Sequence, residues 1–89
     1  MNLLDKIMRL FGYENIENIC IYENFKKYQP RKVKMAERIL FFKETGKLKV
    51  PIVVNKYAGL YGEFWLKDGY TSYLIAKENN IKYVKVVRV

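Results

Sequence analysis

The chain has 89 residues, of which 51% are apolar and 29% are charged, and this length and balance predict one folded domain over residues 1–89. It contains no histidine, which excludes Ser-His, Cys-His and His-ligated metal chemistry within the chain. The single cysteine, Cys20, excludes an internal disulfide, a redox pair of cysteines and a thiolate zinc site. No apolar run is long enough for a signal peptide or a membrane span, so we expect a cytoplasmic protein without membrane contact.

The formal net charge is +8, and it is unevenly distributed along the chain. Residues 1–24 hold two bases and four acids, a net of −2, whereas residues 25–89 hold fifteen bases and five acids, a net of +10. The densest stretch, 26–49, has nine bases against two acids. Such clustering attracts polyanions such as nucleic acid. A lysine-rich surface that only keeps the protein soluble would give the same pattern.

Residues 2–11 are predicted to form a short helix, because Asn2 is a typical N-cap residue and a glycine follows the segment. Leu3, Ile7 and Leu10 recur at helical spacing and form an apolar stripe. This stripe needs a partner, which is either the core of the domain or a second copy of the chain.

Residues 31–45 are predicted to form a second, longer helix that follows a proline and ends before a glycine. The apolar residues expected to pack on the core share one face of this helix: Val33, Ala36 and Leu40, with Ile39 and Phe41 widening it. A basic stripe with the same spacing lies on another face: Arg31, Lys34 and Arg38. The helix therefore offers one face to the core and one to an anionic partner.

The other predicted elements are mainly strands, recognised by β-branched residues, alternation and turn residues. Two of these strands flank a short turn at 57–61 and read as a hairpin. In chain order the elements are a strand at 16–22, strands at 51–56 and 63–68, a helix at 70–78 and a closing strand at 82–89. This order predicts an α+β fold with a small mixed β-sheet packed by helices.

Two stretches of the chain together resemble the N-terminal domain of ParB and its relative sulfiredoxin, in the superfamily of ParB-like nuclease domains. The first is a proline-arginine entry, a helix, a glycine and a strand that begins with proline: Pro30-Arg31, Gly46 and Pro51-Ile52-Val53-Val54. The second is a strand, a sharp turn, a helix and a closing strand: Leu66-Lys67-Asp68-Gly69-Tyr70, Ala76-Lys77 and Ile81 to Val86. The resemblance covers residues 16–89 and leaves residues 1–12 as an extra N-terminal helix.

The resemblance implies a phosphate-binding turn between the strand at 63–68 and the helix that follows it. ParB proteins bind nucleotide phosphates in this fold and serve DNA partition, whereas sulfiredoxins bind ATP and repair oxidised cysteine in another protein. A nucleoside triphosphate with Mg²⁺ and DNA are thus the implied ligands, with a link to plasmid or phage DNA maintenance. This chain has Thr71 and Ser72 where relatives carry arginines, and it lacks a cysteine in the turn, so sulfiredoxin activity is not expected.

Two groups of residues are candidates for ligand binding. The first is the turn, where free N–H groups at a helix start form an anion site, and it comprises Asp68, Gly69, Tyr70, Thr71 and Ser72. The second is the basic stripe and its neighbour, which would follow a nucleic-acid backbone: Arg31, Lys32, Lys34 and Arg38. Each has a plainer interpretation, since Asp68 can simply cap the helix and the stripe can be an ordinary solvated face.

We therefore predict a binding module for nucleic acid or nucleotide phosphate, with no catalytic or metal-binding residue. One alternative is an enzyme, namely a nucleoside triphosphate hydrolase, phosphotransferase or nuclease that uses the turn at Asp68-Gly69. Another is a protein-interaction domain or homodimer with the helix at 2–11 or Trp65 as the contact.

Overall fold

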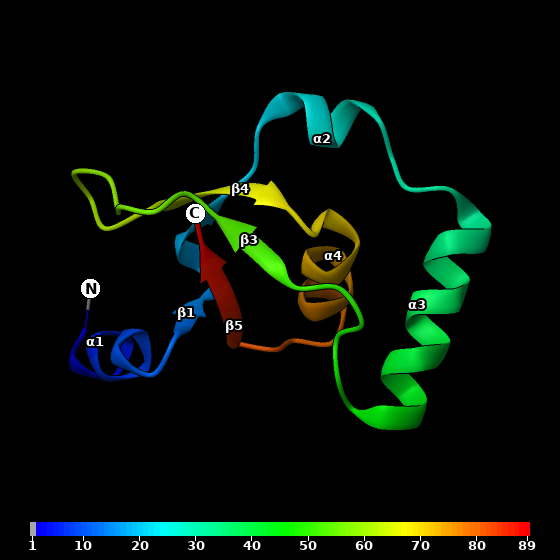
Figure 1. The fold of residues 1–89 in the computed structure, drawn as a ribbon, viewed down its shortest axis with the longest axis horizontal. Coiled ribbons are helices and arrows are strands. Elements are labelled where there is room, and N and C mark those ends of the chain that lie inside the picture. Colours follow the sequence, from blue (N-terminus) through cyan, green and yellow to red (C-terminus); the bar gives the residue numbers. More distant parts are fainter. Residues whose placement is uncertain (1) are drawn as a thin grey trace.

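The computed structural model describes residues 2–89, which form helices around a five-stranded sheet (Figure 1). The elements in chain order are α1 (Leu3–Leu10), β1 (Tyr13–Asn15), the 3₁₀ helix η1 (Ile16–Asn18), β2 (Ile19–Cys20), α2 (Glu23–Lys27), α3 (Lys32–Thr45), β3 (Ile52–Val54), β4 (Phe64–Asp68), α4 (Tyr70–Glu78) and β5 (Tyr83–Arg88). Among residues 2–89, no helix combines the length and apolar character needed to cross a bilayer.

The strands form one mixed sheet in the order β1-β5-β3-β4-β2. β3 and β4 pair antiparallel, with Val54 opposite Leu66, which confirms the predicted hairpin. β5 lies parallel to β3 and antiparallel to β1, and β2 lies parallel to β4. The predicted α+β class with a small mixed sheet is therefore correct.

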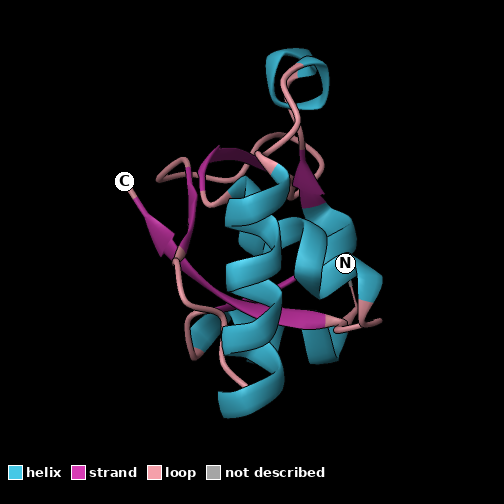
Figure 2. Ribbon diagram, turned by 90° about the vertical axis from the view of Figure 1, so that its right-hand side faces the viewer, coloured by secondary structure: helices cyan, strands magenta, loops and turns pink. Residues whose placement is uncertain are grey.

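The hydrophobic core lies between the sheet and α4. Phe64 and Leu66 of β4 point inward together while Trp65 between them faces outward, as the two-residue period of a strand requires. The other buried apolar side chains come from β3, β5, α4, η1 and β2: Ile16, Ile19, Ile52, Val54, Tyr73, Ile75, Ala76, Val84 and Val86. α3 lies outside this core and runs past α4, as the view from the α3 side shows (Figure 2).

The predicted apolar face of the helix at 31–45 is wrong at its centre and correct only at its margin. Val33 is 82% exposed and Leu40 is 57% exposed, and α3 has no fully buried residue. The half-buried apolar side chains are Met35, Ile39, Phe41 and Phe42, of which Ile39 and Phe41 belonged to the predicted face. The sequence carries two apolar stripes on this helix, and packing against α4 selects the second.

The predicted strand at 16–22 is only partly correct. The chain first turns through η1, because the Asn15 side chain accepts a hydrogen bond from Glu17 N at 3.0 Å, and only Ile19–Cys20 pairs with β4. The elements β1 and α2 were not predicted. β1 escapes a pattern search because two of its three residues are buried polar groups that alternation of apolar and polar residues does not detect.

α1 is fixed to the sheet by its polar side. Asp5 accepts hydrogen bonds from Tyr83 Oη at 2.6 Å and from Asn15 Nδ2 at 3.2 Å. Arg9 donates to Glu14 at 2.9 Å and 2.5 Å, and the Glu14 side chain is fully buried. The predicted apolar stripe of this helix does not join the core, because its side chains remain exposed.

The hydrogen bond between Asp5 and Tyr83 shifts the pKa of both side chains. The hydrogen bond from Tyr83 lowers the pKa of Asp5, with a smaller opposing effect of burial. The same bond, together with burial, raises the pKa of Tyr83 from 10.0 to about 12. Both shifts favour the state in which a carboxylate accepts from a phenol, so the contact stabilises the attachment of α1 around neutral pH.

Candidate phosphate-binding site

The turn between β4 and α4 requires glycine at its centre. Gly69 has φ +86°, in the left-handed region, and it is buried. A Cβ on Gly69 would lie 2.2 Å from the carbonyl oxygen of Pro51 and 3.0 Å from Ile52 Cα. The backbone of the turn therefore packs directly against the start of β3, and this close approach fixes the direction in which α4 begins.

The first turn of α4 presents unpaired backbone donors. Asp68 does not cap the helix, because its Oδ1 accepts from the adjacent Gly69 N at 2.8 Å, and α4 has no side-chain cap. The first intrahelical bond runs from Tyr73 N to Gly69 O. The N–H groups of Tyr70, Thr71 and Ser72 therefore have no partner in the helix.

The hydroxyl of Ser72 has a structural role. It donates to the carbonyl oxygen of Val50 at 2.5 Å, and both Thr71 and Ser72 are buried. This bond ties the first turn of α4 to the chain just before β3. The donors left for a ligand are thus the Thr71 hydroxyl and the backbone N–H groups, which a helix N-terminus directs at an anion together with its dipole.

A pocket of about 350 Å³ lies in front of this turn. It brings the turn together with part of the basic stripe, two features that the sequence separates by some thirty residues. The residues that line it come from the α2–α3 segment, α3 and the two sides of the turn: Phe25, Tyr28, Pro30, Lys34, Arg38, Val50, Asp68, Gly69, Tyr70 and Thr71. Ser72 lies just beyond this lining.

The two cations in the pocket are not neutralised by internal partners. Within residues 2–89, neither Lys34 nor Arg38 forms an ion pair, and Arg38 Nε is buried without a hydrogen-bond partner. Glu37, one of the two acids on the same helix, pairs with Lys49 at 3.1 Å, whose hydrogen bond and charge lower the pKa of Glu37. Asp68 is the one carboxylate in the lining, so positive charge exceeds negative charge there.

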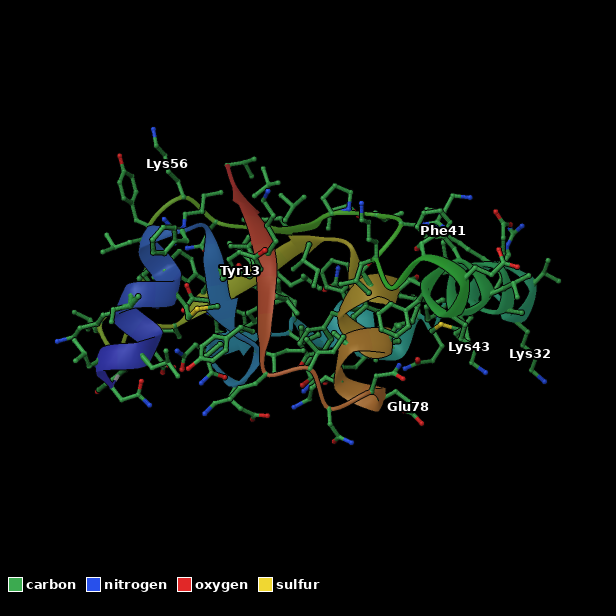
Figure 3. All side chains as sticks on the ribbon, turned by 90° about the horizontal axis from the view of Figure 1, so that it is seen from below. Tyr13, Lys32, Phe41, Lys43, Lys56 and Glu78 are labelled. Atoms are coloured by element: carbon green, nitrogen blue, oxygen red, sulfur yellow. The ribbon has the colours of Figure 1, made fainter. Side chains whose placement is uncertain are left out.

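The rest of the predicted basic group lies outside the pocket. Arg31 occupies the N-cap position of α3 and is exposed. Lys32 projects from the far end of α3 away from the body of the protein (Figure 3). Trp65, the other predicted contact, lies on the outer side of β4, where its ring packs on Tyr22 at a centroid distance of 4.7 Å.

Of the three aromatic residues that line the pocket, the sequence identified only Tyr70 as a site residue. The ring centroids of Phe25 and Tyr70 are 5.5 Å apart, and Tyr28 also lines the pocket. Phe25 lies in the unpredicted helix α2, and Tyr28 lies in the segment that the sequence marks only as a break. The available signal was Tyr28, an aromatic residue shortly before Pro30. The periodicity of a sequence does not show where such a loop residue lies in the fold.

Backbone donors at a helix start, two cations without ion-pair partners among residues 2–89 and an aromatic wall together form a candidate anion-binding site in this α+β domain. No three acidic or cysteine side chains among residues 2–89 lie close enough together to hold a metal ion.

Comparison with solved structures shows which fold this is. The chromosome-partitioning protein ParB from Caulobacter crescentus, C-terminally truncated, is similar in two structures with 19% sequence identity over 86% of this chain. The structure complexed with CTP-gamma-S gives a TM-score of 0.61, and the one complexed to the centromeric parS site gives 0.65. This chain spans 43% and 39% of the length of those chains.

No protein-family model and no curated protein sequence matches the chain. The fold is nevertheless that of a divergent ParB-like domain, which confirms the family resemblance read from the sequence at the level of fold.

Proposed function

We propose that this chain is a ParB-like binding module that holds the phosphate of a nucleotide, or of a nucleic acid, at the start of α4. The observation that carries the proposal is the pocket whose lining joins Lys34 and Arg38 of α3 to the turn at Gly69, where the first N–H groups of α4 have no helical partner. Oriented N–H groups bind phosphate oxygens, and the helix dipole favours negative charge at the same point.

Each charged residue has a distinct role in this proposal. Arg38 supplies the planar guanidinium that pairs with two phosphate oxygens, and a ligand oxygen near its Nε would satisfy the donor that is now unpartnered. Lys34 adds a mobile point charge four residues earlier on the same face. These two cations take the place of the arginines that relatives carry after the turn glycine.

The pocket favours a nucleotide over a bare duplex as its occupant. Its aromatic wall of Phe25, Tyr28 and Tyr70 offers rings on which a base can stack, and a duplex backbone has no unpaired base to place there. Arg31 and Lys32, outside the pocket, remain available to the backbone of a longer nucleic acid. The similarity to ParB structures that contain CTP-gamma-S or parS DNA supports both classes of ligand.

The similarity to ParB extends the proposal to a role in maintaining plasmid or phage DNA.

We assign binding rather than catalysis to the pocket. Hydrolysis or phosphoryl transfer needs a positioned base and metal ligands in addition to phosphate contacts. Asp68 is the one carboxylate in the lining, and its Oδ1 already accepts a hydrogen bond from Gly69.

Calorimetric titration of the full chain with CTP, ATP and GTP, with and without Mg²⁺, tests this proposal. The variant Lys34→Gln/Arg38→Gln removes the two pocket cations, and the matched control Arg31→Gln/Lys32→Gln removes two charges outside the pocket. Hydrogen bonds to charged groups are worth about 1.5–3 kcal/mol each, so we expect the pocket variant to lose at least tenfold in affinity. The control should lose far less.

Equal losses in the two variants would show binding to general positive charge rather than to the pocket. Absence of binding by all three triphosphates would contradict the nucleotide form of the proposal. The nucleic-acid form is tested separately by titrating a DNA duplex at several salt concentrations. Backbone contacts predict an affinity that falls steeply with salt, because each neutralised phosphate releases counterions.

A further inference from the structure

The helix α1 turns its apolar side to water. Five large side chains of this helix and its C-cap are exposed: Leu3, Leu4, Ile7, Leu10 and Phe11. The side that faces the sheet carries Asp5 and Arg9, whose charges are held by Tyr83 and Glu14. A surface helix normally has the reverse orientation. The polar side is fixed by the fold, so rotation of α1 cannot hide the apolar side.

The loop between β3 and β4 is tied to the polar side of α1, where Arg9 Nη2 donates to the carbonyl oxygen of Gly62 at 2.8 Å. This bond further fixes which side of α1 faces the sheet. The α1 patch, as we call the apolar side of the helix with its C-cap, comprises Leu3, Leu4, Ile7, Leu10 and Phe11.

The size of the α1 patch matches a protein interface. Its five large apolar side chains are 42% to 85% exposed, which gives an area of several hundred Å², near the roughly 800 Å² per partner that a standard interface buries. Isolated exposed apolar residues are common, whereas a contiguous patch of this size marks an interaction site. The patch therefore calls for a partner that covers it in solution.

The distribution of charge argues against an anionic membrane as that partner. Residues 1–24, which include α1, carry a net charge of −2, and the remaining chain carries +10. An anionic bilayer binds amphipathic helices that are rich in Lys and Arg, and α1 has only Lys6 besides Arg9, which is already paired. A second copy of the chain meets only the small like charge of −2 at this end, which burial of the apolar side chains outweighs.

The shape of the molecule supports the same partner. α1 lies at one end of the longest axis and α3 at the other (Figure 1), and this axis extends 37 Å. Two copies joined at their α1 ends would keep their basic α3 ends far beyond the Debye length of about 8–10 Å. The strong positive charge of each copy therefore does not oppose this contact.

We propose that the α1 patch is a homodimer interface, in which two copies pack their patches about a twofold axis. The same residues then serve both sides, as in an isologous contact. The two pockets would face outward at opposite ends of the dimer, so that one polyanion can engage both. The dimer contact itself does not depend on the proposed phosphate binding.

Sedimentation velocity of the full chain over a wide concentration series tests the dimer. The variant Ile7→Gln/Leu10→Gln makes the α1 patch polar, and the matched control Val33→Gln/Leu40→Gln changes equally exposed side chains on α3. We expect the patch variant to weaken dimerisation on the order of 100-fold or more, because four apolar side chains leave the interface. The control should dimerise like the unaltered chain. Circular dichroism checks that both variants fold.

The response to salt distinguishes this interface from polyanion binding. Added salt strengthens apolar association and screens the repulsion between two chains of charge +8, so dimerisation should tighten as salt increases. A chain that stays monomeric at every concentration, or a dimer that survives Ile7→Gln/Leu10→Gln, would overturn the proposal. A monomer that binds phosphatidylglycerol vesicles, with binding lost in the patch variant, would overturn it in favour of a membrane partner.

Discussion

Replacement of Gly69 by alanine should lower the free energy of unfolding for two separate reasons. The first is backbone strain, because φ +86° is unfavourable for an L-residue by roughly 1–2 kcal/mol. The second is a collision of the new Cβ with Pro51 O at 2.2 Å, a backbone atom that moves only if the start of β3 moves. Gly12 has nearly the same φ, +84°, but a Cβ at that position would meet no atom within 4 Å.

The two variants should therefore differ in stability. We expect Gly12→Ala to cost about 1–2 kcal/mol, from strain alone. Gly69→Ala should cost at least about 1–3 kcal/mol more, the range for overpacking a site that cannot relax. In a domain of this size each 1 kcal/mol lowers Tm by about 4–8 °C, so thermal and urea unfolding resolve the difference easily. Equal losses for the two variants would refute the close approach of the turn to β3.

Three further substitutions test how the site and α1 are held. Asp5→Asn should destabilise the chain most near neutral pH. The difference in free energy of unfolding from the unaltered chain should shrink in acid, as the lowered pKa of Asp5 is passed. It should shrink again from pH 10 to about 12, as Tyr83 ionises. A difference that does not depend on pH would contradict the contact. Glu14→Gln leaves the Arg9 charge without its buried partner and should lower the free energy of unfolding in urea by about 3–5 kcal/mol. Loss of a surface ion pair would cost much less. Ser72→Ala should lower the free energy of unfolding by about 1–2 kcal/mol in the same assay. An unchanged free energy of unfolding would contradict the buried hydrogen bond from Ser72 to Val50.

Much of the fold follows from local patterns in the sequence. The α4 helix begins and ends where its turn residues predict, and β4 buries Phe64 and Leu66 as alternation requires. On β4 one face is apolar, so alternation and tertiary packing agree, and on α4 the ends of the helix are set by local turn residues. On α3, by contrast, the sequence offers two apolar stripes, and only the position of α4 selects Met35 and Ile39 over Val33.

Buried charge is the second reason why prediction fell short. β1 carries Glu14, which is fully buried because Arg9 pairs with it, and such a residue looks like surface in any pattern of hydrophobicity. For the same reason the sequence does not show which side of α1 faces the sheet. Its apolar stripe suggests an inward face, but the ion pair and the bonds of Asp5 hold the opposite side inward.

The candidate site was partly predictable. The turn at Gly69 and the cations of α3 were each identified from sequence spacing, and the structure places Lys34 and Arg38 in one pocket with the turn. Arg31 lies outside that pocket although it shares their spacing, since it sits at the N-cap before the helix begins. Tyr28 was missed because no local pattern reports which loop residue folds back over a distant turn.

Mapping a bound nucleotide on the backbone amides tests the central proposal most directly. In a titration of ¹⁵N-labelled chain with CTP, followed by amide NMR, we expect the largest shifts at Tyr70, Thr71 and Ser72, whose N–H groups are free. The amides of α1 at the other end of the molecule should stay in place. Shifts confined to the outer residues of α3, with the first turn of α4 unchanged, would contradict the account.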